Sequence, residues 1–169
     1  MKKILALFSI FLTTLFSFTN TQALSAIAAP LQEVEENSEE KVISTQIIPL
    51  NEDYYLEVIT SDTTDPQTAI ARTTYSKTAS KTHNIKNVYG TTVASYTLSA
   101  KFTYNGSTSS CTSASHTESI SVSGWKFSSA TASWSGNKAI GSYLVKCDAL
   151  NQSITKTITI TCDANGNIQ

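Results

Sequence analysis

The chain has 169 residues and a net charge of −1, and its 12 basic residues are scattered along the sequence. Because a basic patch is what recognises nucleic acid, this scatter gives no reason to expect a nucleic-acid partner. The longest apolar run, Ile4 to Phe18, has 15 residues, whereas a helix needs about 20 to cross a membrane. We therefore expect no transmembrane anchor.

The first 28 residues have the pattern of a secretory signal peptide. Lys2 and Lys3 precede the apolar run, and the small residues Ala26-Ile27-Ala28-Ala29 follow it. A secreted, extracellular location is therefore expected. Removal of residues 1–28 leaves about 140 residues, which is enough for one hydrophobic core and one domain.

Charge divides the remainder of the chain into two regions. Residues 30–70 carry ten acidic residues against Lys41, a net of −9, whereas residues 71–169 carry nine basic and three acidic residues, a net of +6. Leu31 to Lys41 is too polar to order on its own. We expect an acidic flexible segment or propeptide over 29–70 and a β domain over 71–169. Residues 42–60 could add an edge strand to that domain, and 61–68 are expected to form a linker.

Alternating polarity predicts the strands of the β domain. Apolar residues occupy the even positions from Ala94 to Tyr104, the period of a half-buried antiparallel strand. Tyr89-Gly90 forms a turn before it, so Lys81 to Val88 is the expected hairpin partner. Further strands are expected at 119–127, 128–134, 138–149 and 153–162. The fold class is therefore all-β, an antiparallel sandwich or small barrel of about six strands.

Three cysteines in an exported chain suggest one disulfide and one free thiol. If 138–149 and 153–162 form a hairpin, Cys147 and Cys162 lie about 20 Å apart, which is too far for a bond. Cys111 follows the long strand and its turn, where it could meet the end of the last strand. We expect a disulfide between Cys111 and Cys162, with Cys147 buried as a small apolar side chain.

Catalytic and metal-binding patterns are weak. A nucleophilic cysteine needs a histidine, and neither His83 nor His116 lies in a recognisable motif. The cysteines and histidines lack zinc-site spacing, and Asp163 to Asn167 is better explained as a turn than as a calcium loop. We expect no catalytic residues, no metal and no cofactor, and therefore a protein that is not an enzyme.

Aromatic residues are the candidate ligand contacts. Tyr89, Trp125 and Trp134 could present a stacking platform for a sugar. Large aromatic side chains in a small domain more often belong to the core, and that is the competing interpretation.

Several motifs resemble those of a known group of proteins. The chain contains Phe102-Thr103-Tyr104-Asn105-Gly106 followed by Cys111, and later Thr161-Cys162 followed by Gly166. In these motifs it resembles a loose group of small secreted β-rich proteins of unknown function from Gram-positive bacteria. The resemblance covers about the last 90 residues. It implies a shared extracellular domain, agrees with the pairing of Cys111 and Cys162, and implies nothing about chemistry.

These observations favour an exported, non-enzymatic β domain that binds an extracellular or cell-wall ligand. The alternative is a secreted antibacterial or toxin-like protein whose acidic segment is a removable prosequence. The N-terminus of the secreted form distinguishes them, because processing would leave it near Ala71 or Arg72 and retention near Ala29 or Pro30. The sequence does not specify the ligand or the oligomeric state.

Overall fold

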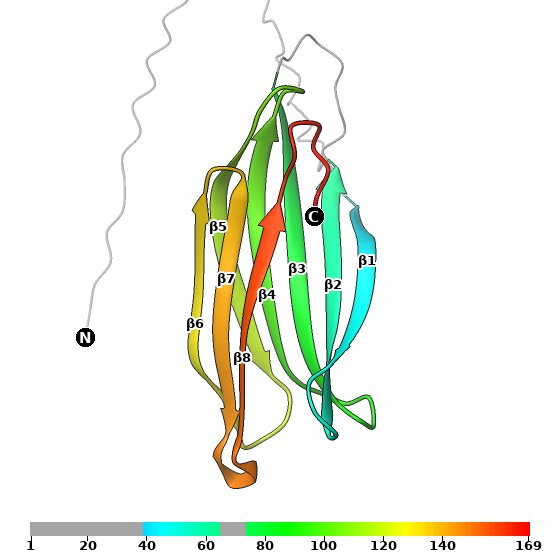
Figure 1. Cartoon of the computed structure of the whole chain (residues 1–169), viewed down its shortest axis with the longest axis vertical. Helices are drawn as coiled ribbons and strands as arrows, with labels where there is room; N and C mark the ends of the chain where they lie inside the picture. The colour runs from blue at the N-terminus through cyan, green and yellow to red at the C-terminus, as the bar shows by residue number, and fades with distance from the viewer. Residues whose placement is uncertain (1–38, 65–73) are drawn as a thin grey trace, which may run out of the picture. The chain divides into compact units, whose positions relative to one another are not determined.

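The structure is a computed structural model that describes residues 39–64 and 74–169. These residues form eight antiparallel strands in two sheets (Figure 1). The larger sheet contains β1 (Glu40–Pro49), β2 (Tyr54–Thr64), β3 (Tyr75–Asn87), β4 (Thr92–Tyr104) and β5 (Ser109–Ile120). The smaller sheet contains β6 (Trp125–Ser135), β7 (Lys138–Cys147) and β8 (Gln152–Thr161), with a short 3-10 turn, η1 (Asp148–Leu150), before β8. The all-β class is confirmed, with two more strands than expected.

Within each sheet, consecutive strands of the chain are hydrogen-bonded to each other, so both sheets are simple meanders. The predicted hairpin of Lys81–Val88 with the long alternating strand is confirmed, because β3 pairs with β4 from Tyr75↔Tyr104 to Lys86↔Thr92. The predicted hairpin of the last two strands is also confirmed, since β7 pairs with β8 from Lys138↔Thr161 to Cys147↔Gln152.

The core lies between the two sheets. Each even position of β4 from Ala94 to Phe102 is at most 2% exposed, as the alternating pattern predicts. The inward residues of β7, which include Tyr143, Val145 and Cys147, face them from the smaller sheet and are also buried. β7 packs over β4 and β8 over β3, and Figure 1 shows β1 and β2 beyond the edge that β8 forms.

One predicted strand was wrong, and one strand of the structure was not predicted. Residues 119–127 do not form one strand, because β5 ends at Ile120 and β6 begins at Trp125. The strand Ser109–Ile120 was missed, since it consists mostly of serine, threonine and alanine and has no apolar alternation. β5 is held in the sheet by its pairing with β4, which runs from Tyr104↔Ser109 to Ala94↔Ile120.

Residues 42–60 belong to the larger sheet, which resolves the alternative that the sequence left open. β2 pairs with β3 over eleven residue pairs, and β1 pairs with β2. The predicted linker at 61–68 is wrong for residues 61–64, which continue β2. Residues 65–68 lie outside the described residues, as do the predicted signal peptide and the acidic residues up to 38. Within the described ranges, no helix is long and apolar enough to span a bilayer.

The last seven residues form a turn, as the sequence predicted for Asp163 to Asn167. The Asp163 carboxylate accepts hydrogen bonds from the backbone N–H groups of Asn165 (2.8 Å) and Asn167 (2.9 Å). Gln169 then exchanges two backbone hydrogen bonds with Thr161, at 2.9 and 3.0 Å. This turn closes one end of the free edge of β8.

Candidate functional site

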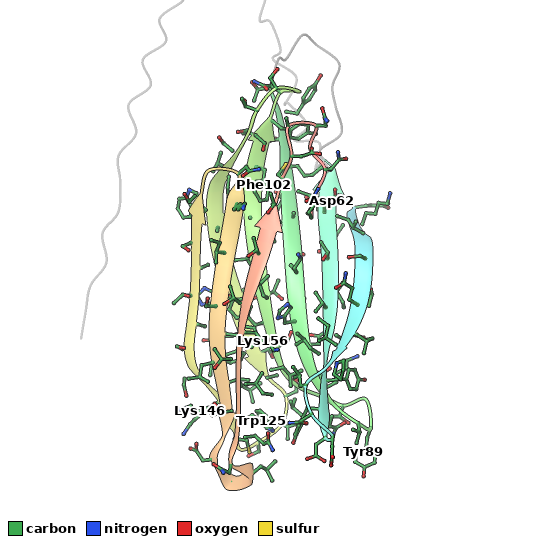
Figure 2. All side chains as sticks on the ribbon, in the orientation of Figure 1. Asp62, Tyr89, Phe102, Trp125, Lys146 and Lys156 are labelled. Carbon is green, nitrogen blue, oxygen red and sulfur yellow. The ribbon has the colours of Figure 1, made fainter. Side chains whose placement is uncertain are left out.

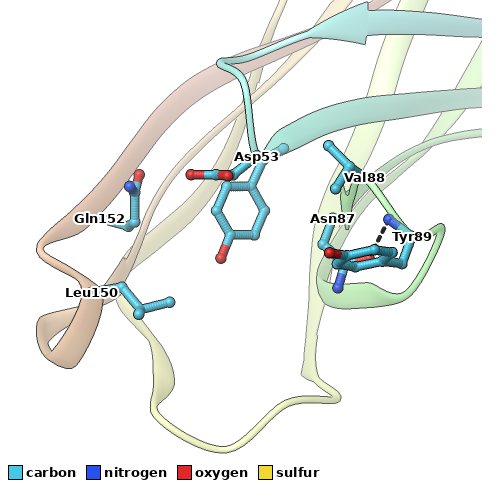
Figure 3. Close-up of a pocket in the computed structure, with 7 residues that line it drawn as sticks. Asp53, Asn87, Val88, Tyr89, Leu150 and Gln152 are labelled. Carbon is cyan, nitrogen blue, oxygen red and sulfur yellow. Dashed lines mark hydrogen bonds between the residues drawn. The ribbon is translucent and has the colours of Figure 1, made fainter.

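Three turns meet at one end of the sandwich and surround a hollow of about 370 Å³ (Figure 3). They are the β1–β2 turn, the β3–β4 turn and the η1 turn before β8. Residues from both sheets therefore form its walls. The lining residues are Asp53, Tyr54, Asn87, Val88, Tyr89, Leu150 and Gln152.

Asparagine side chains fix the two turns of the larger sheet. Asn51 Oδ1 accepts the backbone N–H groups of Asp53 (2.9 Å) and Tyr54 (2.8 Å). Asn87 Oδ1 accepts those of Tyr89 (3.1 Å) and Thr91 (2.9 Å). Such side-chain bonds replace the backbone partners that a turn lacks. These hydrogen bonds define the conformation of both turns.

Two further hydrogen bonds join the turns to one another. The Val88 N–H donates to the Asp53 carbonyl at 3.0 Å, which links the β3–β4 turn to the β1–β2 turn. The Asn51 Nδ2 donates to Gln152 Oε1 at 3.4 Å, which links the larger sheet to the start of β8. These two bonds connect the three turns that line the hollow.

The hollow combines an aromatic surface with polar groups. Tyr89 is 89% exposed, and Val88 and Leu150 are each 55% exposed, so apolar surface is offered directly to solvent. The Asp53 carboxylate and the Gln152 amide stand beside it (Figure 3). Burial raises the pKa of Tyr54, and the nearby charge of Asp53 raises it further, so the phenol remains a neutral hydroxyl.

This set of groups suits recognition of a polyhydroxylated molecule. An aromatic face packs against the apolar C–H face of a sugar ring, while carboxylate and amide groups accept and donate hydrogen bonds to hydroxyls. The seven lining residues include no histidine, cysteine or serine.

The structure separates the three predicted aromatic contacts. Tyr89 lies in the hollow, but Trp125 is only 6% exposed and packs edge-on against Tyr54, with ring centroids 5.3 Å apart (Figure 2). Trp125 therefore supports the wall from the core. Trp134 is 50% exposed at the other end of β6. At about 3.3 Å a residue, it lies roughly 30 Å along the strand from Trp125.

The predicted disulfide between Cys111 and Cys162 is absent, and all three cysteines are free and buried. The Sγ of Cys111 donates to the Ser113 carbonyl at 3.3 Å, and that of Cys162 to the Asp163 carbonyl at 3.4 Å. Burial raises the pKa of both thiols. The sequence argument rested on an oxidising compartment, whereas here backbone hydrogen bonds join these strand ends.

The Gly136–Asn137 turn supplies those hydrogen bonds. The Cys111 N–H donates to the Gly136 carbonyl at 2.8 Å, and the Cys162 N–H donates to the Asn137 carbonyl at 3.2 Å. Cys147 is 3% exposed in the core, as the sequence predicted for it.

The two histidines contact tyrosines in the core. His83 Nδ1 lies 3.1 Å from the Tyr143 hydroxyl, and His116 stacks on Tyr96 with ring centroids 5.5 Å apart. Burial lowers the pKa of His83 to about 4, and the positive charges of Lys81 and Lys156 lower it in the same direction. His83 is therefore neutral near pH 7 and serves as a packed hydrogen-bonding group.

No family model, curated protein or solved structure matches the chain. Among the described residues, no group of three or more potential ligands is placed to hold a metal ion. Sequence reasoning found Tyr89 but missed Asp53 and Gln152. Asp53 was counted within the flexible acidic segment, and Gln152 within a hairpin turn, so neither carried a local signal for the hollow.

Proposed function

We propose that the protein is a secreted, non-enzymatic module that binds an extracellular or cell-wall saccharide in the hollow at the turn end. The exposed ring of Tyr89 carries this proposal. Exposing a large aromatic side chain to water gains nothing for folding, and here the ring is held on a turn that the Asn87 side chain fixes. The Asp53 carboxylate and the Gln152 amide line the same hollow, and both groups are suited to sugar hydroxyls.

The integration of β1 and β2 supports a protein that keeps this region. Asp53 and Tyr54 line the hollow, and β2 pairs with β3 along its length. Cleavage near Ala71 would break the chain between β2 and β3, so β1 and β2 would no longer be covalently linked to the rest of their sheet. We therefore favour a retained segment over the alternative of a toxin-like protein with a removable prosequence.

A binding assay on saccharides tests the proposed function. The protein is incubated with purified cell wall and with isolated wall polysaccharide, and the retained fraction is measured. We expect Tyr89→Ala to weaken retention about tenfold, the loss of one central aromatic contact. Asp53→Asn should weaken it less, because the amide keeps the shape and half of the acceptors.

Trp134→Ala is the matched control, because it removes an exposed aromatic ring far from the hollow. It should leave retention unchanged. Equal retention by the wild type, Tyr89→Ala and Trp134→Ala would refute the hollow as the binding site. Secretion is tested separately by the mass of the chain in the culture medium, which should place the N-terminus near Ala29 or Pro30.

A further inference from the structure

The outer edge of β1 combines unpaired backbone with exposed apolar side chains. Among the described residues, β1 pairs only with β2 and forms one edge of the larger sheet. Val42, Ile43, Ile47 and Ile48 are 57%, 44%, 59% and 41% exposed, so they offer apolar surface that the fold does not use. Such an edge is a template for another strand, and proteins usually block it with lysine or proline. No charged residue occurs from Val42 to Pro49, and the proline stands only at the end.

Two other sheet edges, β8 and β5, are protected at specific points. On β8, Lys81 Nζ donates to the Thr159 carbonyl at 2.8 Å, and Gln169 pairs with Thr161. On β5, the Cys111 N–H donates to the Gly136 carbonyl that follows β6. β5 also has only one large aliphatic side chain, Ile120, which is its last residue. In β1, the stretch from Val42 to Ile48 carries no charge and lies between Lys41 and Pro49.

The polarity of β1 is symmetric about Thr45. Residues 42–48 read Val-Ile-Ser-Thr-Gln-Ile-Ile, with two apolar residues on either side of three polar ones. Because the bulge at Ile43 adds one residue on that side, an antiparallel copy centred on Thr45 places Val42 of one chain opposite Ile47 of the other, and Lys41 opposite Ile48. Lys41 then faces an uncharged side chain, so no like charges lie opposite each other in this register.

The faces of the sheet agree with this register. Val42 pairs with Ser61 and Ile47 pairs with Glu57, and these partners are four residues apart in β2, so both side chains lie on the same face. The bulge at Ile43 absorbs the one extra residue between them. Val42 of one copy can then lie across from Ile47 of the other without crossing the sheet.

We propose that β1 is the self-association surface of this protein, through which two copies form an antiparallel, two-fold symmetric dimer with Thr45 at the axis. The two larger sheets join into one continuous sheet. An isologous pairing of this kind uses the same residues from both copies and closes on itself, so it ends at the dimer. The interface of two edge strands is small, and association is therefore reversible and dependent on concentration. This inference does not depend on the proposed saccharide site.

Sedimentation velocity of the purified protein, from low micromolar to near-millimolar concentration, tests the proposal. We expect a reversible monomer–dimer equilibrium for the wild type. Thr45→Lys and Thr45→Glu each place two like charges at the axis, and each alone should be monomeric. An equimolar mixture of the two should regain the dimer, because opposite charges then meet there. The control is Ile140→Lys, which charges a 37% exposed isoleucine on β7 and should dimerise as the wild type does.

A second variant gives a test that does not depend on charge. Thr45→Cys should form a covalent dimer under mild oxidation, whereas the wild-type cysteines are buried. Circular dichroism establishes that each variant is folded. A wild type that stays monomeric at the highest concentration overturns the proposal. Dimerisation that survives Thr45→Lys, or that is lost equally in Ile140→Lys, overturns it as well.

Discussion

Gly141 allows the two sheets to approach each other at the centre of the sandwich. It lies in β7 between Ala132 of β6 and Ile158 of β8, and it does not have a positive φ. A Cβ added there would lie 2.4 Å from the hydroxyl oxygen of Tyr96 and 3.1 Å from two of its ring carbons. The Tyr96 ring is 1% exposed and stacks on Tyr143 with ring centroids 4.8 Å apart, so it has little room to move.

We expect Gly141→Ala to destabilise the fold by about 2–3 kcal/mol. Overpacking a core costs about 1–3 kcal/mol. Displacing the Tyr96 hydroxyl also weakens its hydrogen bond to the Thr131 carbonyl, 2.6 Å long, which adds about 1 kcal/mol. Replacing glycine returns about 0.4–1 kcal/mol, because the unfolded chain becomes less flexible. Urea unfolding followed by tryptophan fluorescence measures the net change.

Tyr96→Phe supplies the control, because it removes the atom closest to the new methyl group. Alone it should cost about 1–2 kcal/mol through the lost hydrogen bond. In the Gly141→Ala background it should cost at least about 1 kcal/mol less, because the hydrogen bond is already weakened and the contact is relieved. A change under about 0.5 kcal/mol for Gly141→Ala, or strict additivity in the double variant, would refute this reasoning.

Three further expectations follow from individual residues. Because burial lowers the pKa of His83 from 6.5 to about 4, the unfolded chain takes up a proton first as the pH falls. The stability that neutral His83 provides is fully present above pH 6.5 and is lost between pH 6.5 and about 4, a change of roughly 3 kcal/mol. Denaturant unfolding at several pH values measures this loss of stability. If the free energy of unfolding of His83→Gln fell equally with pH, the expectation would be contradicted. Trp125→Ala should cost about 3–5 kcal/mol and Trp134→Ala under about 1 kcal/mol, because only the first ring is buried; similar midpoints in urea would disprove the difference. Asp163→Ala should increase hydrogen exchange at the backbone amides of Thr161 and Gln169, since the carboxylate organises the final turn, and unchanged protection would show that the turn forms without it.

The sequence predicted the parts of the fold that have a local signal. The alternation from Ala94 to Tyr104 predicted β4 because a half-buried strand needs an apolar residue at every second position. β5 lacked that signal, since its serines and threonines are held by pairing with β4. Sequence reasoning left residues 42–60, which include β1, as either an edge strand or part of a propeptide.

The candidate site was predictable only in part. Tyr89 was named with Trp125 and Trp134 as an aromatic residue that could stack on a sugar, and the structure exposes its ring in the hollow. Asp53 and Gln152 are 99 positions apart and meet only because the two sheets bring their turns to the same end. Trp125 could not be assigned from its type, since a strand's first residue can point either into the core or outward. The disulfide was inferred from the expected compartment and from where the strands end; the structure brings Cys111 and Cys162 close enough to interact electrostatically, but both thiols are free.

The order of the strands has a consequence for how the chain folds. Every strand pair within a sheet joins neighbours in the sequence, so each hydrogen-bonded ladder closes a short loop. Folding is faster when native contacts are local, because less chain entropy is lost before contacts form. We expect the hairpins to form one after another. Burial of Tyr96 against Tyr143, which brings the two meanders together, then becomes the late, rate-determining event.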